Sequence, residues 1–215
     1  MSRRPAIDEQ ALKAVRKRLR EHSLAKRAAM DEHERAQYAA RICAALAGLL
    51  ADIGPRRLGF CWPFRGEVDV RETVGAWLAQ DASRQAGLPV VIAPRMAMAF
   101  RRWAPGAPMI DDAYGIAIPA RDERLQPDCL LLPLVAFDDA GHRLGYGAGY
   151  FDRTIAALAA TGQRPRVIGL GFECLRCPTI HPQPHDAPLD WLITEAGVFR
   201  RQGTKMTPSS PATDR

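Results

Sequence analysis

Residues 128–153 read DCLLLPLVAFDDAGHRLGYGAGYFDR. The stretch begins with an apolar run at 129–135, which predicts a buried strand, although periodicity alone does not exclude a buried helical segment. Asp138, Asp139 and Gly141 then form a turn cluster. Glycines follow at positions 145, 147 and 149, and a helical pattern begins near residue 150. We therefore expect a strand, a glycine-rich loop and a helix start, in that order.

This layout is suited to holding phosphate. Glycine lets the backbone approach a ligand closely, and the free N–H groups of a first helical turn favour an anion. Arg143 and Arg153 can pair with phosphate, and Asp152 can hold a magnesium ion. The spacing has neither the GK[ST] nor the GxGxxG pattern of other nucleotide-binding loops. The alternative interpretation is a glycine-rich turn with a surface ion pair.

The same stretch resembles the signature of the 5-formyltetrahydrofolate cyclo-ligase family, also called 5,10-methenyltetrahydrofolate synthetases. That signature is P-x-x-A-F-D-x-x-G-x-R-L-G-Y-G-G-G-Y-Y-D-R. The residues that carry the resemblance are Pro133, Ala136, Phe137, Asp138, Gly141, Arg143, Leu144, Gly145, Tyr146, Gly147, Gly149, Tyr150, Asp152 and Arg153. Ala148 and Phe151 depart from the signature, at positions where glycine and tyrosine are common. Phe151 lacks the hydroxyl that a tyrosine would offer to a substrate.

The resemblance implies an enzyme that cyclises 5-formyltetrahydrofolate to 5,10-methenyltetrahydrofolate and releases ADP and phosphate. ATP would be the co-substrate and Mg²⁺ the cofactor. The resemblance implies catalytic roles for Arg143, Asp152 and Arg153. It implies an ATP site made of Arg16, Arg20, Arg143, Gly145, Tyr146, Gly147, Ala148, Gly149, Tyr150, Phe151, Asp152 and Arg153.

The N-terminal segment predicts a basic helix at 8–29. A sparse apolar stripe accompanies it, formed by Ala11, Val15, Leu19 and Leu24. Arg16 and Arg20 stand four residues apart and so share a face. By resemblance to the family's basic N-terminal helix, this pair would clamp phosphate. Lys13 or Lys17 would take that role in a shifted register, and a solvated basic face is the alternative.

The resemblance also implies a folate site made of Trp62, Glu67, Met98, Tyr150 and Phe151. Glu67 is the candidate pterin anchor, because a carboxylate can accept from the N3–H and the 2-amino group together. Alternatively, Glu67 caps the helix expected at 70–79, and Met98 is a core residue of a strand. For the metal, the resemblance implies Asp152 and Asp186 as ligands.

Two further positions depart from the family pattern. Ile118 and Gln183 stand where the family often has acids. Together with Ala148 and Phe151, these departures favour a rival hypothesis from another class. It is a basic protein that binds folate or associates with RNA and has lost catalysis.

Composition narrows the class of protein. The chain has 215 residues and a formal net charge of +6, with 47% hydrophobic and 25% charged residues, which is ordinary for one globular domain. Neither a run of 18 or so apolar residues nor an apolar secretory segment is visible, so we expect no membrane span and a cytoplasmic protein. The basic segment lacks interleaved aromatics, so we expect small-molecule partners, ATP and a folate with or without a polyglutamate tail, rather than nucleic acid. We expect a monomer.

The five cysteines do not form the pattern of a disulfide framework. Cys174 and Cys177 make a CxxC pair. Structural zinc would need a second such pair or histidines at matching spacing. A redox motif would need the pair at a helix start after a strand, and Pro178 leaves that alternative open.

Strands that alternate with helices predict an α/β fold. We expect a single three-layer α/β/α domain over residues 1–200, around a mostly parallel sheet, and a disordered polar tail at 201–215. The expected helices span 8–29, 31–50 and 70–79, and the expected strands span 57–62, 88–93, 98–103, 129–135, 166–172 and 191–195. Ligands in such sheets bind beyond the carboxyl ends of the strands.

Overall fold

The computed structural model describes residues 8–209 of the chain. A nine-stranded sheet runs through it, in the order β13-β12-β11-β10-β7-β1-β2-β3-β6. The strands, in chain order, are β1 Arg57–Gly59, β2 Gln85–Val90, β3 Ala99–Trp103, β6 Arg124–Leu125, β7 Cys129–Pro133, β10 Arg166–Leu170, β11 Trp191–Thr194, β12 Gly197–Gln202 and β13 Lys205–Pro208. The five strands from β11 to β2 are parallel, and two strands at each margin pair antiparallel. The α/β prediction is confirmed, with a sheet that is mixed and parallel only at its centre.

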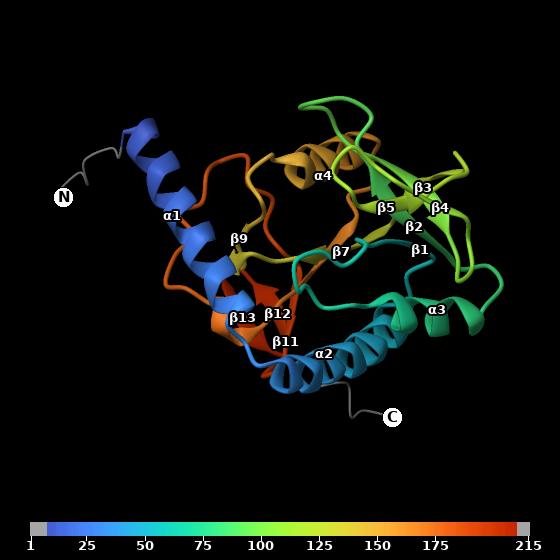
Figure 1. Cartoon of the computed structure of the whole chain (residues 1–215), viewed down its shortest axis with the longest axis horizontal. Helices are drawn as coiled ribbons and strands as arrows, with labels where there is room; N and C mark the ends of the chain where they lie inside the picture. Colours follow the sequence, from blue (N-terminus) through green and yellow to red (C-terminus); the bar gives the residue numbers. More distant parts are fainter. Residues whose placement is uncertain (1–7, 210–215) are drawn as a thin grey trace.

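Helices cover both faces of this sheet. They are α1 Glu9–Ala28, α2 Glu32–Ile53, α3 Arg71–Ala79, α4 Tyr150–Ala160 and the short 3-10 helix η1 Glu173–Leu175. In Figure 1, α2 and α3 lie below the central strands and α4 lies above them. The arrangement is the expected three layers, and α1 packs at one side against η1 and β8 (Ala136–Phe137).

The central strand β7 comes from the apolar run of the sequence. Its residues Cys129–Leu132 are buried, because helices cover both sheet faces there. On the lower face, Ile42 and Leu46 of α2 are fully buried in the same core. By length and composition alone α2 could span a membrane. Its packing on α3, β11 and β12 gives it the position of a core helix instead.

The chain reverses its direction of winding between β1 and β7, which are neighbours in the sheet. From β1 it passes through α3 to β2, and from β7 it passes through α4 to β10. The two crossovers lie on opposite faces, as Figure 1 shows, so the loops after β1 and β7 diverge. Such a point is where open α/β sheets bind ligands.

Two small ladders flank the main sheet. The β8 strand pairs with β9 (Arg143–Leu144) between β7 and the glycine loop. The other ladder joins β4 (Met109–Asp111) to β5 (Ala117–Pro119). The sequence predicted neither ladder, because strands of two or three residues leave too short a pattern.

The predicted disordered tail is wrong for residues 201–209. β12 and β13 form an antiparallel hairpin at the margin of the sheet, with Arg201 opposite Met206. Gly203, with φ of 61°, makes its turn. The composition was misleading because an edge hairpin buries little; in this hairpin Val198, Phe199 and Met206 are partly buried against the core. The domain therefore includes residues up to 209, and residues 210–215 lie outside the described part.

The inward face of α1 also differs from the prediction. Its buried residues are Arg16, Ser23 and Arg27, whereas Val15 of the expected apolar stripe is exposed. Positions 16, 20, 23 and 27 share one face of a helix. α1 thus presents a row of polar side chains to the domain, and it is held by ion pairs and hydrogen bonds more than by an apolar stripe.

Candidate active site

The entrance to the glycine loop is fixed by the buried carboxylate of Asp138. Its Oδ1 accepts from the N–H of Ala140 and His142 at 3.1 and 3.0 Å, and its Oδ2 accepts from Ile180 N at 3.2 Å. Several backbone donors on one carboxylate set the turn between β8 and β9. The chain therefore leaves β9 in a defined direction, toward the carboxyl ends of β1 and β7.

The backbone N–H groups of the glycine loop, residues 145–149, are unpaired hydrogen-bond donors in the described part of the chain. Gly147 and Gly149 have φ of 105° and 66°, a region that favours glycine. Among residues 8–209, no group accepts a hydrogen bond from the backbone N–H groups of this loop. α4 begins directly after it, and no side chain caps that helix. Unpaired N–H groups at a loop and helix start are the arrangement that anions favour.

Two arginines from different elements lie on this loop. Arg20 of α1 donates from Nε to Gly145 O at 2.9 Å, and Arg153 of α4 donates from Nη2 to Ala148 O at 2.7 Å. The Arg153 guanidinium also lies 5.2 Å from the centre of the Tyr150 ring. Both guanidinium groups keep further donors free for a bound anion. These two predicted phosphate ligands are brought together.

Arg143 is buried and faces away from open solvent. It donates from Nη2 to Asp152 Oδ1 at 2.9 Å and from Nη1 to the carbonyl of Ala187. Ala187 N donates to the same Asp152 oxygen at 3.1 Å. Arg143 therefore holds Asp152, at the first turn of α4, against the 186–187 segment.

Arg16 forms a second closed pair. Its Nη1 and Nη2 donate to the two oxygens of Asp186 at 2.5 and 3.1 Å, and both side chains are almost fully buried. Burial acts to raise the pKa of Asp186, but hydrogen bonds from Arg16 and Gln183 N outweigh it and hold that pKa below its usual value. The alternative clamps Lys13 and Lys17 pair with Glu9 and Glu21 on the exposed face. Arg16 and Arg20 are thus the inward pair, Arg16 bound to Asp186 and Arg20 to the glycine loop, and their role as a phosphate clamp stays a prediction.

The two expected metal ligands differ in what they can offer. Asp152 Oδ1 has two donors, while no donor to its Oδ2 is found in the described part of the chain. Both oxygens of Asp186 accept hydrogen bonds. Across residues 8–209 no group of three or more potential metal ligands occurs. Mg²⁺ keeps several waters and needs only one or two carboxylates beside phosphate, so Asp152 fits such an ion and Asp186 fits once its pair with Arg16 opens.

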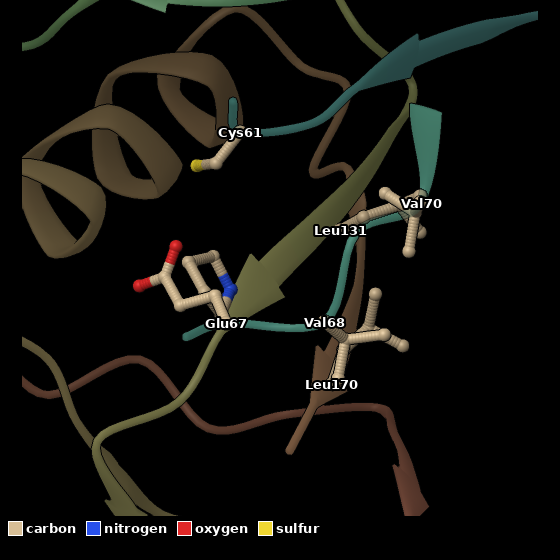
Figure 2. Close-up of a pocket in the computed structure, with 7 residues that line it drawn as sticks. Cys61, Glu67, Val68, Val70, Leu131 and Leu170 are labelled. Atoms are coloured by element: carbon tan, nitrogen blue, oxygen red, sulfur yellow. The ribbon is translucent and has the colours of Figure 1, made fainter. Parts of the chain in front are cut away.

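Glu67 lines a small pocket beside the end of β7. The pocket wall is formed by Cys61, Glu67, Val68, Val70, Leu131, Pro133 and Leu170. Figure 2 shows the Glu67 carboxylate and the Cys61 thiol on one side of it, with the labelled aliphatic side chains turned the other way. The volume of about 10 Å³ is room for roughly one water molecule.

The Glu67 carboxylate already has partners. Oε2 accepts from Phe64 N at 3.1 Å, and Oε1 accepts from the Tyr146 hydroxyl at 2.8 Å. Burial raises its pKa, against the opposing effects of Tyr146 and Arg27. The helix-cap alternative is wrong, because α3 has Val70 as its N-cap residue with no side-chain cap bond.

Arg27 is a site residue that the sequence analysis missed. The residue is 2% exposed, and its guanidinium donates to Leu134 O at 3.1 Å and to the Tyr146 hydroxyl at 2.8 Å. A helical-face count from Arg16 and Arg20 would have found it, since position 27 continues that face. Sequence reasoning followed the apolar stripe of α1 instead.

The other predicted folate residues lie around the same edge. Trp62 packs on the core under the guanidinium of Arg71. Met98 lies just before β3 and donates from its backbone N–H to Thr154 Oγ1 of α4 at 3.0 Å. Phe151 packs against the core, and the Tyr150 hydroxyl lies 3.5 Å from that of Tyr114. Tyr150, Phe151 and Met98 therefore lie in or against α4, whereas Trp62 packs beside α3 under Arg71.

Within residues 8–209 neither cysteine of the CxxC pair belongs to a group of three potential metal ligands. Cys174 lies in η1, and burial raises its pKa. Cys177 donates to Phe137 O, and burial raises its pKa to about 11. A raised pKa disfavours the thiolate that redox exchange and metal binding need. Both cysteines therefore fit a structural role.

The fold and the site together define an α/β protein with a glycine loop, whose N–H groups have no acceptor among residues 8–209, and a partly buried carboxylate at the switch point of its sheet. The sequence profile of the 5-formyltetrahydrofolate cyclo-ligase family matches residues 12–195. The chain belongs to this family of enzymes, as the resemblance predicted.

Similar proteins agree with this membership. The chain is 29% identical over 140 residues to the 5-formyltetrahydrofolate cyclo-ligase of Haemophilus influenzae, which covers 62% of this chain and 73% of the relative. It is 29% identical over 144 residues to that of Escherichia coli K12, covering 63% and 76%. The NMR structure of Aquifex aeolicus 5,10-methenyltetrahydrofolate synthetase matches with a TM-score of 0.72 and 25% identity, over 94% of this chain and 100% of that one.

Proposed function

We propose that this protein catalyses the ATP- and Mg²⁺-dependent cyclisation of 5-formyltetrahydrofolate to 5,10-methenyltetrahydrofolate, with release of ADP and phosphate. The observation that carries the proposal is the direct contact between two candidate subsites. Tyr146 of the glycine loop donates to Glu67 at 2.8 Å. A nucleotide phosphate on the loop and a pterin at Glu67 would therefore lie side by side.

The reaction needs positioning and charge neutralisation more than a covalent nucleophile. The formyl oxygen attacks the γ-phosphate and displaces ADP. N10 then attacks the activated formyl carbon and loses its proton to solvent, and inorganic phosphate leaves with the former formyl oxygen. Phosphorylation converts the amide oxygen into a good leaving group. In this scheme the loop N–H groups, Arg20 and Arg153 hold the phosphates, and Glu67 orients the pterin.

From the sequence we expected Arg143 and Arg16 to bind phosphate, and we now propose a different role for them. Each is buried in a pair with an aspartate, so we assign them to holding Asp152 and Asp186 in place. Mg²⁺, when bound, would neutralise phosphate charge. Asp152 would hold it through the oxygen that accepts from no protein donor in the described part, and Asp186 would add a ligand if Arg16 turned to phosphate.

The test is an assay of the pure protein with 5-formyltetrahydrofolate, ATP and Mg²⁺, followed through the absorbance of the methenyl product. We expect ATP-dependent product, with one ADP formed for each product molecule. Product formation without ATP, or no product at high enzyme concentration, would reject the proposal. The second outcome, with folate still bound, would favour the rival that has lost catalysis.

Three further properties belong to the same proposal. We expect a cytoplasmic monomer that acts on free small molecules, including polyglutamylated folates. The family membership supports small-molecule substrates. Sedimentation of the pure protein with and without substrates measures the oligomeric state.

A further inference from the structure

Three side chains from separate segments meet beside the pocket: Arg27 of α1, Glu67 after β1 and Tyr146 of the glycine loop. The Tyr146 hydroxyl lies 2.8 Å from both Arg27 Nη2 and Glu67 Oε1. A guanidinium can only donate, so the hydroxyl accepts from Arg27 and gives its own proton to Glu67. Burial and the nearby carboxylate raise the pKa of Tyr146, which keeps that proton in place. The direction of both hydrogen bonds is therefore fixed.

Arg27 has more donors than partners. Nη1 donates to Leu134 O and Nη2 to Tyr146, while its buried Nε has no partner among residues 8–209. A buried N–H without an acceptor costs free energy. This corner of the site would therefore gain from a ligand that brings an oxygen acceptor.

Tyr146 is the member of the trio that can move. Its side chain is 43% exposed, whereas Arg27 is buried. It lies between Gly145 and Gly147 on a loop without backbone hydrogen bonds from its N–H groups to the described residues. Because the Tyr146 hydroxyl already donates to Glu67 Oε1, a pteridine ring can donate to that oxygen only after the Tyr146 side chain has left.

We propose that the Tyr146 hydroxyl stands in the place of the pteridine lactam, and that Arg27 donates to the 4-oxo oxygen of the bound ring while Glu67 accepts from its N3–H. The inference rests on the proposed function and adds Arg27 to the folate site. A lactam carries an N–H donor and a C=O acceptor side by side. The single hydroxyl now performs both functions, toward Glu67 and toward Arg27. Arg27 is thus a specificity residue for a 4-oxo ring over a 4-amino ring.

Two ligands that differ at position 4 test this assignment: folic acid, with a 4-oxo group, and aminopterin, with a 4-amino group. Their dissociation constants would be measured without nucleotide, for the wild type and for Arg27→Met. We expect Arg27→Met to weaken folic acid binding about tenfold or more, and to change aminopterin binding by no more than about twofold. The control is Lys26→Met, at an exposed neighbour on α1, which should leave both constants unchanged.

Tyr146→Phe is the second variant, and its position on an exposed loop makes it safe for folding. Loss of the competing hydroxyl should strengthen folic acid binding, by roughly threefold or more. Weaker folic acid binding by Tyr146→Phe would overturn the inference. So would equal losses of both ligands, or no loss, in a folded Arg27→Met protein. If the wild type binds neither compound, the proposed function fails and takes this inference with it; if it binds folic acid but Arg27→Met keeps the ligand ratio, only the inference fails.

Discussion

The site has two walls, the glycine loop and the Glu67 carboxylate, and they differ in whether their hydrogen-bonding groups already have partners in the protein. In the glycine loop, residues 145–149, the N–H groups have no acceptor among the described residues. The Glu67 carboxylate, in contrast, accepts at 2.8 Å from Tyr146 and at 3.1 Å from Phe64 N. A phosphate would add hydrogen bonds to the first wall, whereas a pterin must replace one on the second. Nucleotide binding therefore requires mainly that the loop becomes ordered. Folate binding requires that the pterin replaces Tyr146 as the hydrogen-bond donor to Glu67.

The largest expected effect concerns Asp152, at the nucleotide wall. We expect Asp152→Ala to lower kcat by on the order of a thousandfold, because its carboxylate would hold Mg²⁺ beside the transferred phosphate. Asp152→Asn is the control: it keeps an oxygen that can accept from Arg143 and Ala187, yet should be nearly as inactive. Wild-type activity in a folded Asp152→Ala protein would remove Asp152 from the metal site.

The next effect concerns the closed pair of Arg16 and Asp186. Removing one partner of a buried ion pair leaves an uncompensated charge, so Arg16→Met should lower the free energy of unfolding by about 3–5 kcal/mol. Lys13→Met breaks the exposed pair with Glu9 and should change it by less than about 1 kcal/mol. Urea unfolding measures both. Equal effects of the two variants would show that burial of the Arg16 pair does not matter.

The conformation of the glycine loop gives the third prediction. Gly149 has φ of 66°, and a Cβ there would lie 2.9 Å from Arg153 Nη1. Gly149→Ala should therefore cost about 1–3 kcal/mol in loop conformation and raise the KM for ATP. Gly145→Ala is its control, since a Cβ at that position meets nothing within 4 Å. A larger KM change in the Gly145 variant would contradict the role given to the loop.

Glu67→Gln tests the second wall. A glutamine cannot accept from two pterin N–H groups at once, so we expect the KM for folate to rise by about tenfold or more with the KM for ATP unchanged. Asp69→Asn, at an exposed carboxylate paired with Arg71, should change neither constant. Unchanged folate affinity in Glu67→Gln would overturn the assignment of the pterin anchor.

The smallest effect is a pH dependence at Glu67. Burial raises its folded-state pKa above the ordinary value of 4.5, so the carboxylate takes up a proton at a higher pH than an exposed glutamate does. Folate affinity should fall as the pH drops through that raised pKa, because the protonated acid accepts fewer hydrogen bonds. The free energy of unfolding should also fall as the pH rises from 4.5 to the raised pKa, because over this range the folded state binds more protons at Glu67 than the unfolded state does. Glu67→Gln should remove this pH dependence from both measurements.

The sequence predicted the elements that have a clear local pattern. It missed features that depend on which polar residues are buried in the fold. The run at 129–135 and the glycines at 145–149 identified β7, the loop and the start of α4. Arg27 was missed because the sequence reasoning followed the apolar stripe of α1, although position 27 continues the helical face of Arg16 and Arg20 and is only 2% exposed. The edge hairpin at 197–208 was missed because its polar residues match a solvated tail. The partners of Arg27 lie more than 100 residues away in the sequence, whereas the hairpin pairs neighbouring residues and was missed because of its composition.

The most direct test of the central claim is a crystal structure with a non-hydrolysable ATP analogue, Mg²⁺ and 5-formyltetrahydrofolate bound. We expect the phosphates against the N–H groups of residues 145–149, the pterin on Glu67, and the Tyr146 side chain moved away from it. A nucleotide bound elsewhere, with the glycine loop empty, would contradict the account.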